Sequence, residues 1–188
     1  MRKAGEANGS GRSLFQSMKT SEKPLIFIVD DDKSFLKTIE LYVKQFFQNY
    51  KVFTFLTGEE CLQSLNLKPD IVLLDYILNA NYPDAMNGLK ILNTIKKTNP
   101  ETAIIMLSGQ DRVGVAVDTM KHGAFDYIVK DDHLFYNVQN AIKNVRHALD
   151  LKKDKDRYKL KMQLLLALLV ALVGILVYMT IFRRYLLF

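Results

Sequence analysis

Ile71-Val72-Leu73-Leu74-Asp75 is a short apolar run that ends abruptly in a carboxylate. Pro69 and Asp70 precede it, and a loop is expected after it. A wholly apolar run of this length is typical of a strand that is buried on both faces in the middle of a parallel sheet. Ligands bind such sheets just beyond the carboxyl ends of the strands. Because an unpaired buried charge is costly, we expect Asp75 to be paired or to bind a metal there.

Four similar runs predict further strands, and apolar residues at helical spacing follow each of them. After the first strand, one of Asp30, Asp31 and Asp32 is expected to cap a helix, most simply Asp32. After the second, Thr57-Gly58-Glu59-Glu60 has capping-box spacing and opens a helix that carries Cys61, Leu62 and Leu65. The expected strands are 25–29, 52–55, 71–75, 103–107 and 125–129. Five strand–helix units in a row predict an α/β fold with a right-handed, doubly wound, five-stranded parallel sheet.

The composition excludes several classes of function. The chain has 188 residues, which is enough for about one domain with a core. Its net charge is +6, but the basic residues gather in the N-terminal tail and in 143–161, so nucleic-acid binding is not expected. Cys61 is the single cysteine and is expected to be a reduced, packed thiol.

A second feature is an unbroken apolar run without a charge over residues 164–182. As a helix it would reach roughly 28 Å, about the thickness of the hydrocarbon core of a bilayer. We expect a transmembrane helix rather than a buried core helix, because the five-stranded unit is complete without this run. No Gly or Pro interrupts 134–163, so the last helix of the domain is expected to continue to the span.

The expected organisation follows from these boundaries. A disordered tail (1–23) precedes a domain (24–150), a charged helical linker (151–163), the span (164–182) and a short tail (183–188). The chain is thus expected to be a single-pass membrane protein, and the positive-inside rule places the domain in the cytoplasm. The basic residues before the span are Lys152, Lys153, Lys155, Arg157, Lys159 and Lys161, and those after it are Arg183 and Arg184.

Polar residues stand at the carboxyl ends of four expected strands. Asp30 and Asp31 follow the first, Asp75 ends the third, Ser108 follows the fourth and Lys130 follows the fifth. Taken singly, each could be a cap, a turn residue or a surface charge. Together they suit phosphoryl transfer to a carboxylate. Asp75 would attack phosphorus, Mg²⁺ held by the three carboxylates would neutralise charge, and Lys130 would pair with a phosphoryl oxygen.

From residue 25 to about residue 147 the chain resembles a response-regulator receiver domain, a flavodoxin-like fold. The matching motifs are the pair Asp30-Asp31, "DIVLLD" (70–75), "IIMLSG" (104–109) and "FDYIVK" (125–130). The resemblance implies that Asp75 accepts a phosphoryl group from a histidine kinase or a histidine phosphotransfer protein. It implies Mg²⁺ on Asp30, Asp31, Asp75 and the backbone carbonyl of Ile77, and it implies that Ser108 and Tyr127 act as the switch.

The resemblance also has consequences at the level of the whole chain. The chain is expected to be a membrane-anchored receiver in a two-component phosphorelay, and not a turnover enzyme. Its partners are expected to be the phosphodonor protein and the lipid bilayer. A homodimer through the fourth helix, fifth strand and fifth helix is a further expectation.

Two departures from the family pattern bear on the site. Asp131 follows Lys130, where the family usually has a proline, which puts the usual loop geometry in doubt. The polar stretch between Asp75 and Gly88, which includes 79–87, is longer than usual. It is expected either to modify access and partner choice or to be a tolerated insertion.

Two other functions remain open. One is a Mg²⁺-dependent phosphatase of the haloacid-dehalogenase type, because Asp30-Asp31-Asp32-Lys33-Ser34 fits its D-x-D-x-S/T opening. Ser108, Lys130 and the pair Asp131-Asp132 would then supply its later motifs, but Asp75 would have no role. The other is a receiver-like binding module that is not phosphorylated, and the intact site counts against it.

Overall fold

The computed structural model describes residues 23–78, 86–109 and 113–186. The chain divides into two compact units, Met1–Gln139 and Asn140–Phe188. The expected tail 1–23 lies almost wholly outside the described residues, and so does most of the long polar stretch (79–85).

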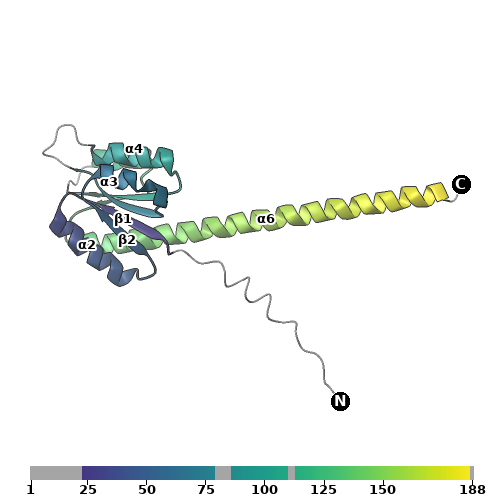
Figure 1. Cartoon of the computed structure of the whole chain (residues 1–188), viewed down its shortest axis with the longest axis horizontal. Coiled ribbons are helices and arrows are strands. Elements are labelled where there is room, and N and C mark those ends of the chain that lie inside the picture. Colours follow the sequence, from purple (N-terminus) through teal and green to yellow (C-terminus); the bar gives the residue numbers. More distant parts are fainter. Residues whose placement is uncertain (1–22, 79–85, 110–112, 187–188) are drawn as a thin grey trace, which may run out of the picture. The chain divides into compact units, whose positions relative to one another are not determined.

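The first unit is built on a five-stranded parallel sheet with the strand order β2-β1-β3-β4-β5. Figure 1 labels its neighbouring strands β1 and β2. The strand order confirms the expected doubly wound sheet, because the chain moves outward from β1 in one direction and then from β3 in the other. All five residues of the central strand β3 are buried, as its unbroken apolar run predicts. The strands are β1 Leu25–Val29, β2 Lys51–Phe55, β3 Ile71–Asp75, β4 Ala103–Ser108 and β5 Asp126–Val129.

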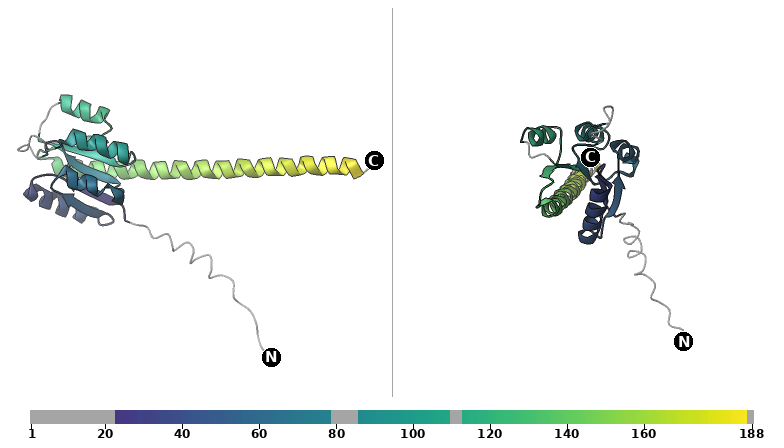
Figure 2. Two further views of the ribbon diagram at one scale, coloured as in Figure 1. Left: turned by 45° about the horizontal axis from the view of Figure 1, so that its top comes forward. Right: turned by 90° about the vertical axis from the view of Figure 1, so that its left-hand side faces the viewer.

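Helices connect the strands and lie on both faces of the sheet (Figure 2). The ring of Tyr42 in the first of these helices packs against the ring of Phe135 in the last, with ring centroids 4.8 Å apart. The helices are α2 Lys33–Phe46, α3 Gly58–Gln63, the short 3₁₀ helix η1 Leu65–Leu67, α4 Gly88–Thr98, α5 Val113–Lys121 and α6 Leu134–Leu186.

One expected helix ends earlier than the sequence predicts. Leu65 was expected in the helix that begins at Gly58, but α3 ends at Gln63 and Leu65 begins η1. The backbone N–H of Ser64 donates to the carbonyl of Cys61 at 3.0 Å, which tightens the last turn. Lys68 then adopts a left-handed conformation (φ 53°) that stops η1. Leu65 is nevertheless buried, so its apolar side chain still contributes to the core.

Helix starts in the first unit follow the predicted caps. One carboxylate oxygen of Asp32 accepts from the backbone N–H groups of Ser34 (2.8 Å) and Phe35 (3.1 Å), which confirms Asp32 as the N-cap of α2. The Thr57 hydroxyl accepts from the N–H of Glu60 at 3.2 Å. Each cap fixes the direction in which its helix leaves the sheet edge.

Cys61 lies on α3 with no exposed surface. Burial raises the pKa of its thiol to about 12, so it is protonated at neutral pH. The prediction of a packed cysteine is therefore confirmed.

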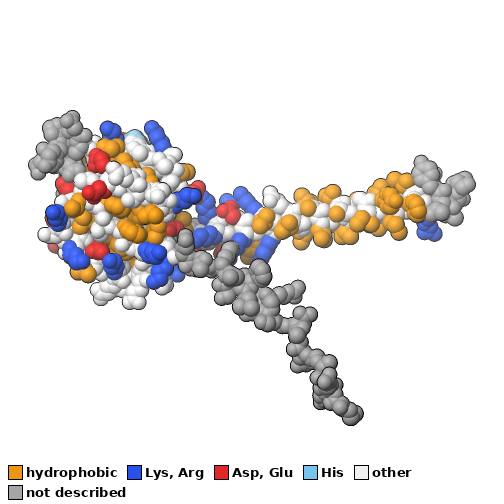
Figure 3. Space-filling model, in the orientation of Figure 1, with side chains coloured by type: hydrophobic (Ala, Val, Ile, Leu, Met, Phe, Trp, Pro, Cys, Tyr) orange, Lys and Arg blue, Asp and Glu red, His pale blue; other side chains and the backbone are white. Residues whose placement is uncertain are grey.

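The second unit consists of the rest of α6, which continues without interruption to Leu186. This continuity was predicted from the absence of Gly and Pro over 134–163. By length and composition, α6 is the one helix among the described residues that could cross a membrane. Its large apolar side chains from Leu164 to Phe182 are exposed, and Lys and Arg side chains gather before them (Figure 3).

Candidate functional site

The candidate site lies at the carboxyl ends of β1, β3, β4 and β5. Asp30 follows β1, and its backbone N–H donates to the carbonyl of Phe55 at 3.1 Å. Asp75 is the last residue of β3 and pairs in register with Leu107 of β4. Lys130 follows β5, and its N–H donates to the carbonyl of Ser108 at 2.7 Å. The sheet register therefore brings four separate chain segments to one edge.

Three carboxylates meet at this edge, and we call Asp30, Asp31 and Asp75 the carboxylate cluster. One oxygen from each lies within 4.8 Å of the others. Asp30 is 1% exposed and Asp75 5% exposed, while Asp31 is exposed. Two unit charges at this separation repel by about 3.5 kcal/mol at an effective dielectric constant of about 20. The carboxylate cluster therefore has a high density of negative charge, and it is open to solvent on the side of Asp31.

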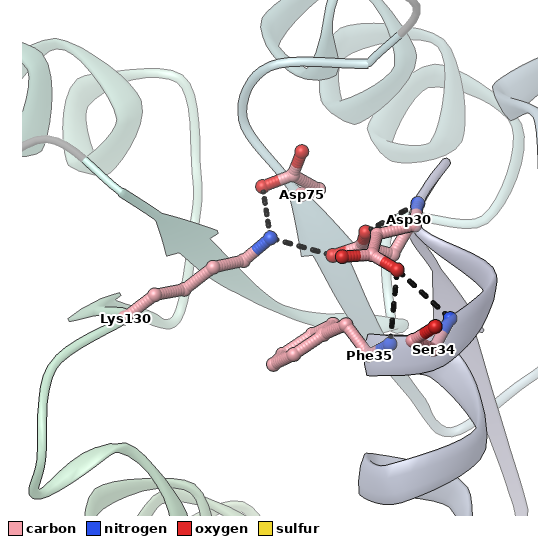
Figure 4. A network of polar contacts seen from close by, with 6 residues as sticks. Asp30, Ser34, Phe35, Asp75 and Lys130 are labelled. Atoms are coloured by element: carbon pink, nitrogen blue, oxygen red, sulfur yellow. Dashed lines mark hydrogen bonds and ion pairs between the residues drawn. The ribbon is translucent and has the colours of Figure 1, made fainter.

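Lys130 partly neutralises the carboxylate cluster. Its Nζ lies 2.6 Å from Asp30 Oδ2 and 2.8 Å from Asp75 Oδ1, between the two buried carboxylates (Figure 4). The same ammonium lies 4.5 Å from the centre of the Phe35 ring, which covers it from the side of α2. One ammonium offsets only one of three negative charges, so the site keeps a net negative charge when all three carboxylates are ionised.

The pKa values of Asp75 and Lys130 reflect these contacts. Burial raises the pKa of the Asp75 carboxyl to about 6, against the opposing attraction of Lys130 and with a smaller repulsion from Asp30 and Asp31. For Lys130, burial alone would lower the pKa. The attraction of Asp75 and Asp30 outweighs burial, so the pKa of the ammonium is raised. Near neutral pH the pair is therefore a carboxylate and an ammonium.

The donor set fits Mg²⁺. Mg²⁺ prefers carboxylate and carbonyl oxygens and binds through one or two carboxylates together with water or phosphate oxygens. The carboxylate cluster supplies oxygen ligands from two strand ends, and its uncompensated negative charge favours a cation. Asp32, the next residue, does not join the cluster, because its side chain caps α2 and its N–H donates to Asp30 Oδ1 at 3.0 Å.

Ser108 and Tyr127 occupy the positions that the family resemblance implies for a switch. Ser108 is the last residue of β4 and is fully buried, at the same sheet edge as Asp75. Tyr127 lies in β5, half-buried against the hydrophobic core cluster. Ile77 follows two residues after Asp75, and its side chain is largely outside the core.

The residue after the lysine does not prevent the lysine from reaching the site. Asp131 accepts from the N–H of His133 through its side chain at 2.8 Å and from the N–H of Leu134 through its carbonyl at 3.1 Å. It thus organises the turn into α6, while Lys130 still contacts both carboxylates. Lys130 therefore keeps its contacts with Asp30 and Asp75 although Asp131 stands where the family usually has a proline.

Two residues at the site were not singled out from the sequence. Phe35 is an apolar residue of α2, and its ring faces the Lys130 ammonium. Gly88 is the first residue of α4. A Cβ atom at Gly88 would collide with the carbonyl oxygen of Asp75 and lie 2.8 Å from Cα of Tyr76. The Gly88 N–H also donates to the carbonyl of Tyr76 at 3.0 Å, so α4 begins in direct contact with the backbone of the site.

Comparison with known proteins agrees with this geometry. A family model of the response regulator receiver domain matches residues 26–139. The chain is 38% identical over 104 residues, 53% of its length, to the luminescence regulatory protein LuxO of Vibrio campbellii. That match spans 21% of LuxO, so the similarity concerns about a fifth of this relative.

Two solved structures are similar to the first unit. A response regulator receiver domain protein from Clostridium thermocellum is 27% identical with a TM-score of 0.60, and the match covers 68% of this chain and 98% of that one. The signal receiver domain of a putative LuxO repressor protein from Vibrio parahaemolyticus is 28% identical with a TM-score of 0.57, covering 69% and 97%. The family model covers more than half of the chain, and the sheet order and polar edge agree with it. The chain therefore belongs to the response regulator receiver family of two-component signalling.

Proposed function

We propose that this chain is a membrane-anchored receiver in which Asp75 accepts a phosphoryl group from a histidine kinase or a histidine phosphotransfer protein. The observation that carries the proposal is the position of Asp75. Its buried carboxylate lies 2.8 Å from an ammonium and within 4.8 Å of two further carboxylates. This combination of nucleophile, ammonium and acidic cluster suits phosphoryl transfer.

The transfer requires an ionised Asp75. Because the pKa of Asp75 is about 6, the carboxylate form dominates near neutral pH. One oxygen of Asp75 forms a bond to phosphorus while the bond from phosphorus to the imidazole nitrogen of the donor breaks. The electron pair of that bond stays on the imidazole, which then takes up a proton, and Asp75 becomes an acyl phosphate.

The remaining residues of the site bind and orient the phosphoryl group. Asp30, Asp31, Asp75 and, by family resemblance, the backbone carbonyl of Ile77 would hold Mg²⁺, which would supply positive charge to the phosphoryl oxygens. Lys130 exchanges its contact with Asp75 for one with a phosphoryl oxygen and keeps its contact with Asp30. The hydroxyl of Ser108 donates to another phosphoryl oxygen, which draws the end of β4 toward Asp75.

The movement of Ser108 is the start of the proposed switch. Tyr127 lies in β5, which is paired with β4, and is only half-buried. A shift of Ser108 would let this ring change rotamer and alter the surface of α5 and β5. We place a phosphorylation-dependent contact with a partner, or with a second copy, at that surface.

The C-terminal part of α6 is proposed to be the membrane anchor. It comprises the linker 151–163, the span 164–182 and the tail 183–188, and the receiver (24–150) faces the cytoplasm. ATP-dependent kinases act on that side, so the site and the topology are compatible. Anchoring would raise the effective concentration of the receiver near a membrane-bound kinase without any additional contact.

The experiment uses the full chain in lipid nanodiscs with acetyl phosphate and Mg²⁺, followed by intact mass. One phosphoryl group should be added in the wild type and none in Asp75→Asn. Asp32→Asn is the matched control, because Asp32 caps a helix next to the site, and it should still be phosphorylated. Phosphorylation of Asp75→Asn to the wild-type extent would contradict the proposal. Extraction of membranes with alkaline carbonate tests the anchor, and release of the chain into the supernatant would contradict it.

A further inference from the structure

Apolar side chains on α6 are exposed before the span begins. Leu151 is 72% exposed, Tyr158 70% and Met162 69%, within a stretch that is otherwise dominated by Lys, Arg and Asp. Further along the helix exposure is expected of lipid-facing side chains, but these three lie in the charged segment, as does Leu160 (59% exposed) on another face of the helix. Large apolar side chains on a helix in water are usually covered by something.

These side chains share one face of the helix. Leu151 and Tyr158 are seven residues apart, Met162 follows after four and Leu165 after three. This is the spacing of the a and d positions of a coiled-coil heptad, with Ala148, Lys155 and Met162 at a and Leu151, Tyr158 and Leu165 at d. At about 100° per residue, Leu151 lies about 120° around the helix from Val145, so the exposed Leu151 and the buried Val145 are on different faces of α6. We call the six residues at these a and d positions the heptad seam.

Lipid accounts for only part of the heptad seam. Met162 and Tyr158 are close enough to the start of the span to contact the membrane interface. Leu151 is thirteen residues before Leu164, which is about 20 Å along the helix axis. That distance exceeds the range of an interfacial contact for a helix that continues directly into the span.

We propose that the heptad seam pairs with the same seam of a second copy of this chain, as a parallel two-stranded coiled coil next to the membrane. The parallel orientation rests on the proposed anchoring, since two copies inserted in the same direction present their seams side by side. A second copy also supplies an identical apolar stripe at the same height, which an unrelated partner would not need to do.

The charges beside the heptad seam favour this arrangement. In a parallel pair, a g residue of one helix faces the e residue of the next heptad in its partner. Asp154 is at g and Lys159 at the following e, so opposite charges meet, and symmetry forms the pair twice. The Asp154 side chain is 62% exposed and lies 3.9 Å from Arg157 on its own helix, so it can reach a partner. The preceding g–e pair, His147 with Lys152, adds no attraction.

Lys155 is the exception within the heptad seam. A lysine at a single a position lowers the stability of a coiled coil but restricts its register and number of strands. The seam therefore predicts a weak dimer, whose association should be sensitive to this one residue. Replacing Lys155 by leucine should strengthen the dimer, whereas removing a lysine elsewhere on the same helix should not.

The first test compares matched variants of the full chain in mild detergent, with the dimer fraction measured by sedimentation. Lys155→Leu should lower the dimer dissociation constant several-fold, while Lys153→Leu, the same substitution at an outward f position, should leave it close to wild type. Asp154→Lys should weaken the dimer, Asp156→Lys should not, and the double variant Asp154→Lys with Lys159→Asp should recover wild-type association. Equal effects of Lys155→Leu and Lys153→Leu, or a wild type that is monomeric throughout, would overturn the inference.

The second test uses disulfide crosslinking in native membranes, in a Cys61→Ala background. Tyr158→Cys, on the heptad seam, should crosslink several-fold more than Leu160→Cys, which is also exposed (59%) but lies at an f position. Equal crosslinking at both positions would refute the seam. Membrane fractionation of the same samples separates the two proposals. A chain that stays in the membrane without seam-specific crosslinks contradicts only the dimer, and a soluble chain that crosslinks only at the seam contradicts only the anchor.

Discussion

Replacing Asp75 by asparagine should increase the free energy of unfolding of the metal-free protein, and the increase should grow with pH. The reason is the position of Asp75, whose carboxyl is buried at the sheet edge beside two other carboxylates. Asparagine has nearly the same shape and carries no charge. The substitution therefore removes an unfavourable buried charge and leaves the packing of β3 unchanged.

The magnitude follows from the pKa of Asp75. The folded state raises this pKa from 3.8 to about 6, chiefly through burial. Because the folded state holds the proton more tightly than the unfolded chain, Asp75 reduces stability as pH rises through this range. A difference of about two pH units between the two states corresponds to about 3 kcal/mol, complete above about pH 7. About half of this is already present at pH 5, so the advantage of Asp75→Asn should grow by about 1.5 kcal/mol between about pH 5 and pH 7.5.

Urea unfolding of the full chain in mild detergent, followed by far-ultraviolet circular dichroism, measures this difference. Asp150→Asn is the control, because it makes the same substitution at an exposed carboxylate of α6. Adding Mg²⁺ should stabilise the wild type more than Asp75→Asn, since the cation offsets the charge that the variant lacks. A stability difference that stays constant from pH 5 to pH 7.5 would refute the argument that burial raises the pKa of Asp75.

Three further substitutions test other parts of the site. Gly88→Ala should destabilise the fold by about 1–3 kcal/mol and weaken Mg²⁺ binding, because the added Cβ would press on the backbone of Asp75. Gly114→Ala is the control, since a Cβ there has open space and should change neither quantity. Urea unfolding measures the stability, and Mg²⁺ titration measures the binding. Lys130→Met should slow phosphorylation by acetyl phosphate and raise the pKa of Asp75 further, because the carboxylate cluster loses its counter-charge. Phosphorylation kinetics that intact mass shows to be unchanged would contradict a role for Lys130 in the transfer. Asp32→Ala should lower the unfolding free energy by about 1 kcal/mol through loss of the α2 cap, yet leave phosphorylation intact, and loss of phosphorylation in a folded Asp32→Ala would instead place Asp32 in the site.

The apolar runs predicted the fold well because each strand of a parallel sheet is buried and its run is short. Ile71 to Asp75 is the clearest case, since all five residues of β3 are buried as predicted. The rule that strand ends meet at one edge then placed Asp30, Asp75 and Lys130 together without any knowledge of distances. Helix ends were less predictable, because α3 ends at Gln63 although no Gly or Pro marks that position in the sequence.

Other features depend on three-dimensional contacts that no periodic pattern records. Val113, Val117 and Met120 have helical spacing and lie in α5, but all three are exposed, so their spacing does not reveal which face is buried. The contact of Gly88 with Asp75 joins residues from two elements whose approach is set by the packing of α4. The pKa of Asp75 likewise depends on how completely the site is buried, which the identity of the residue does not determine.

The most direct test of the proposed function is to identify the residue that carries the phosphoryl group. The full chain, in lipid nanodiscs with Mg²⁺, is incubated with acetyl phosphate, the acyl phosphate is trapped with borohydride, and the reduced residue is mapped by peptide mass spectrometry. A receiver predicts reduction at Asp75 alone, with Mg²⁺ required. Reduction at Asp30 that persists in Asp75→Asn would contradict the proposal and favour a phosphatase of the haloacid-dehalogenase type.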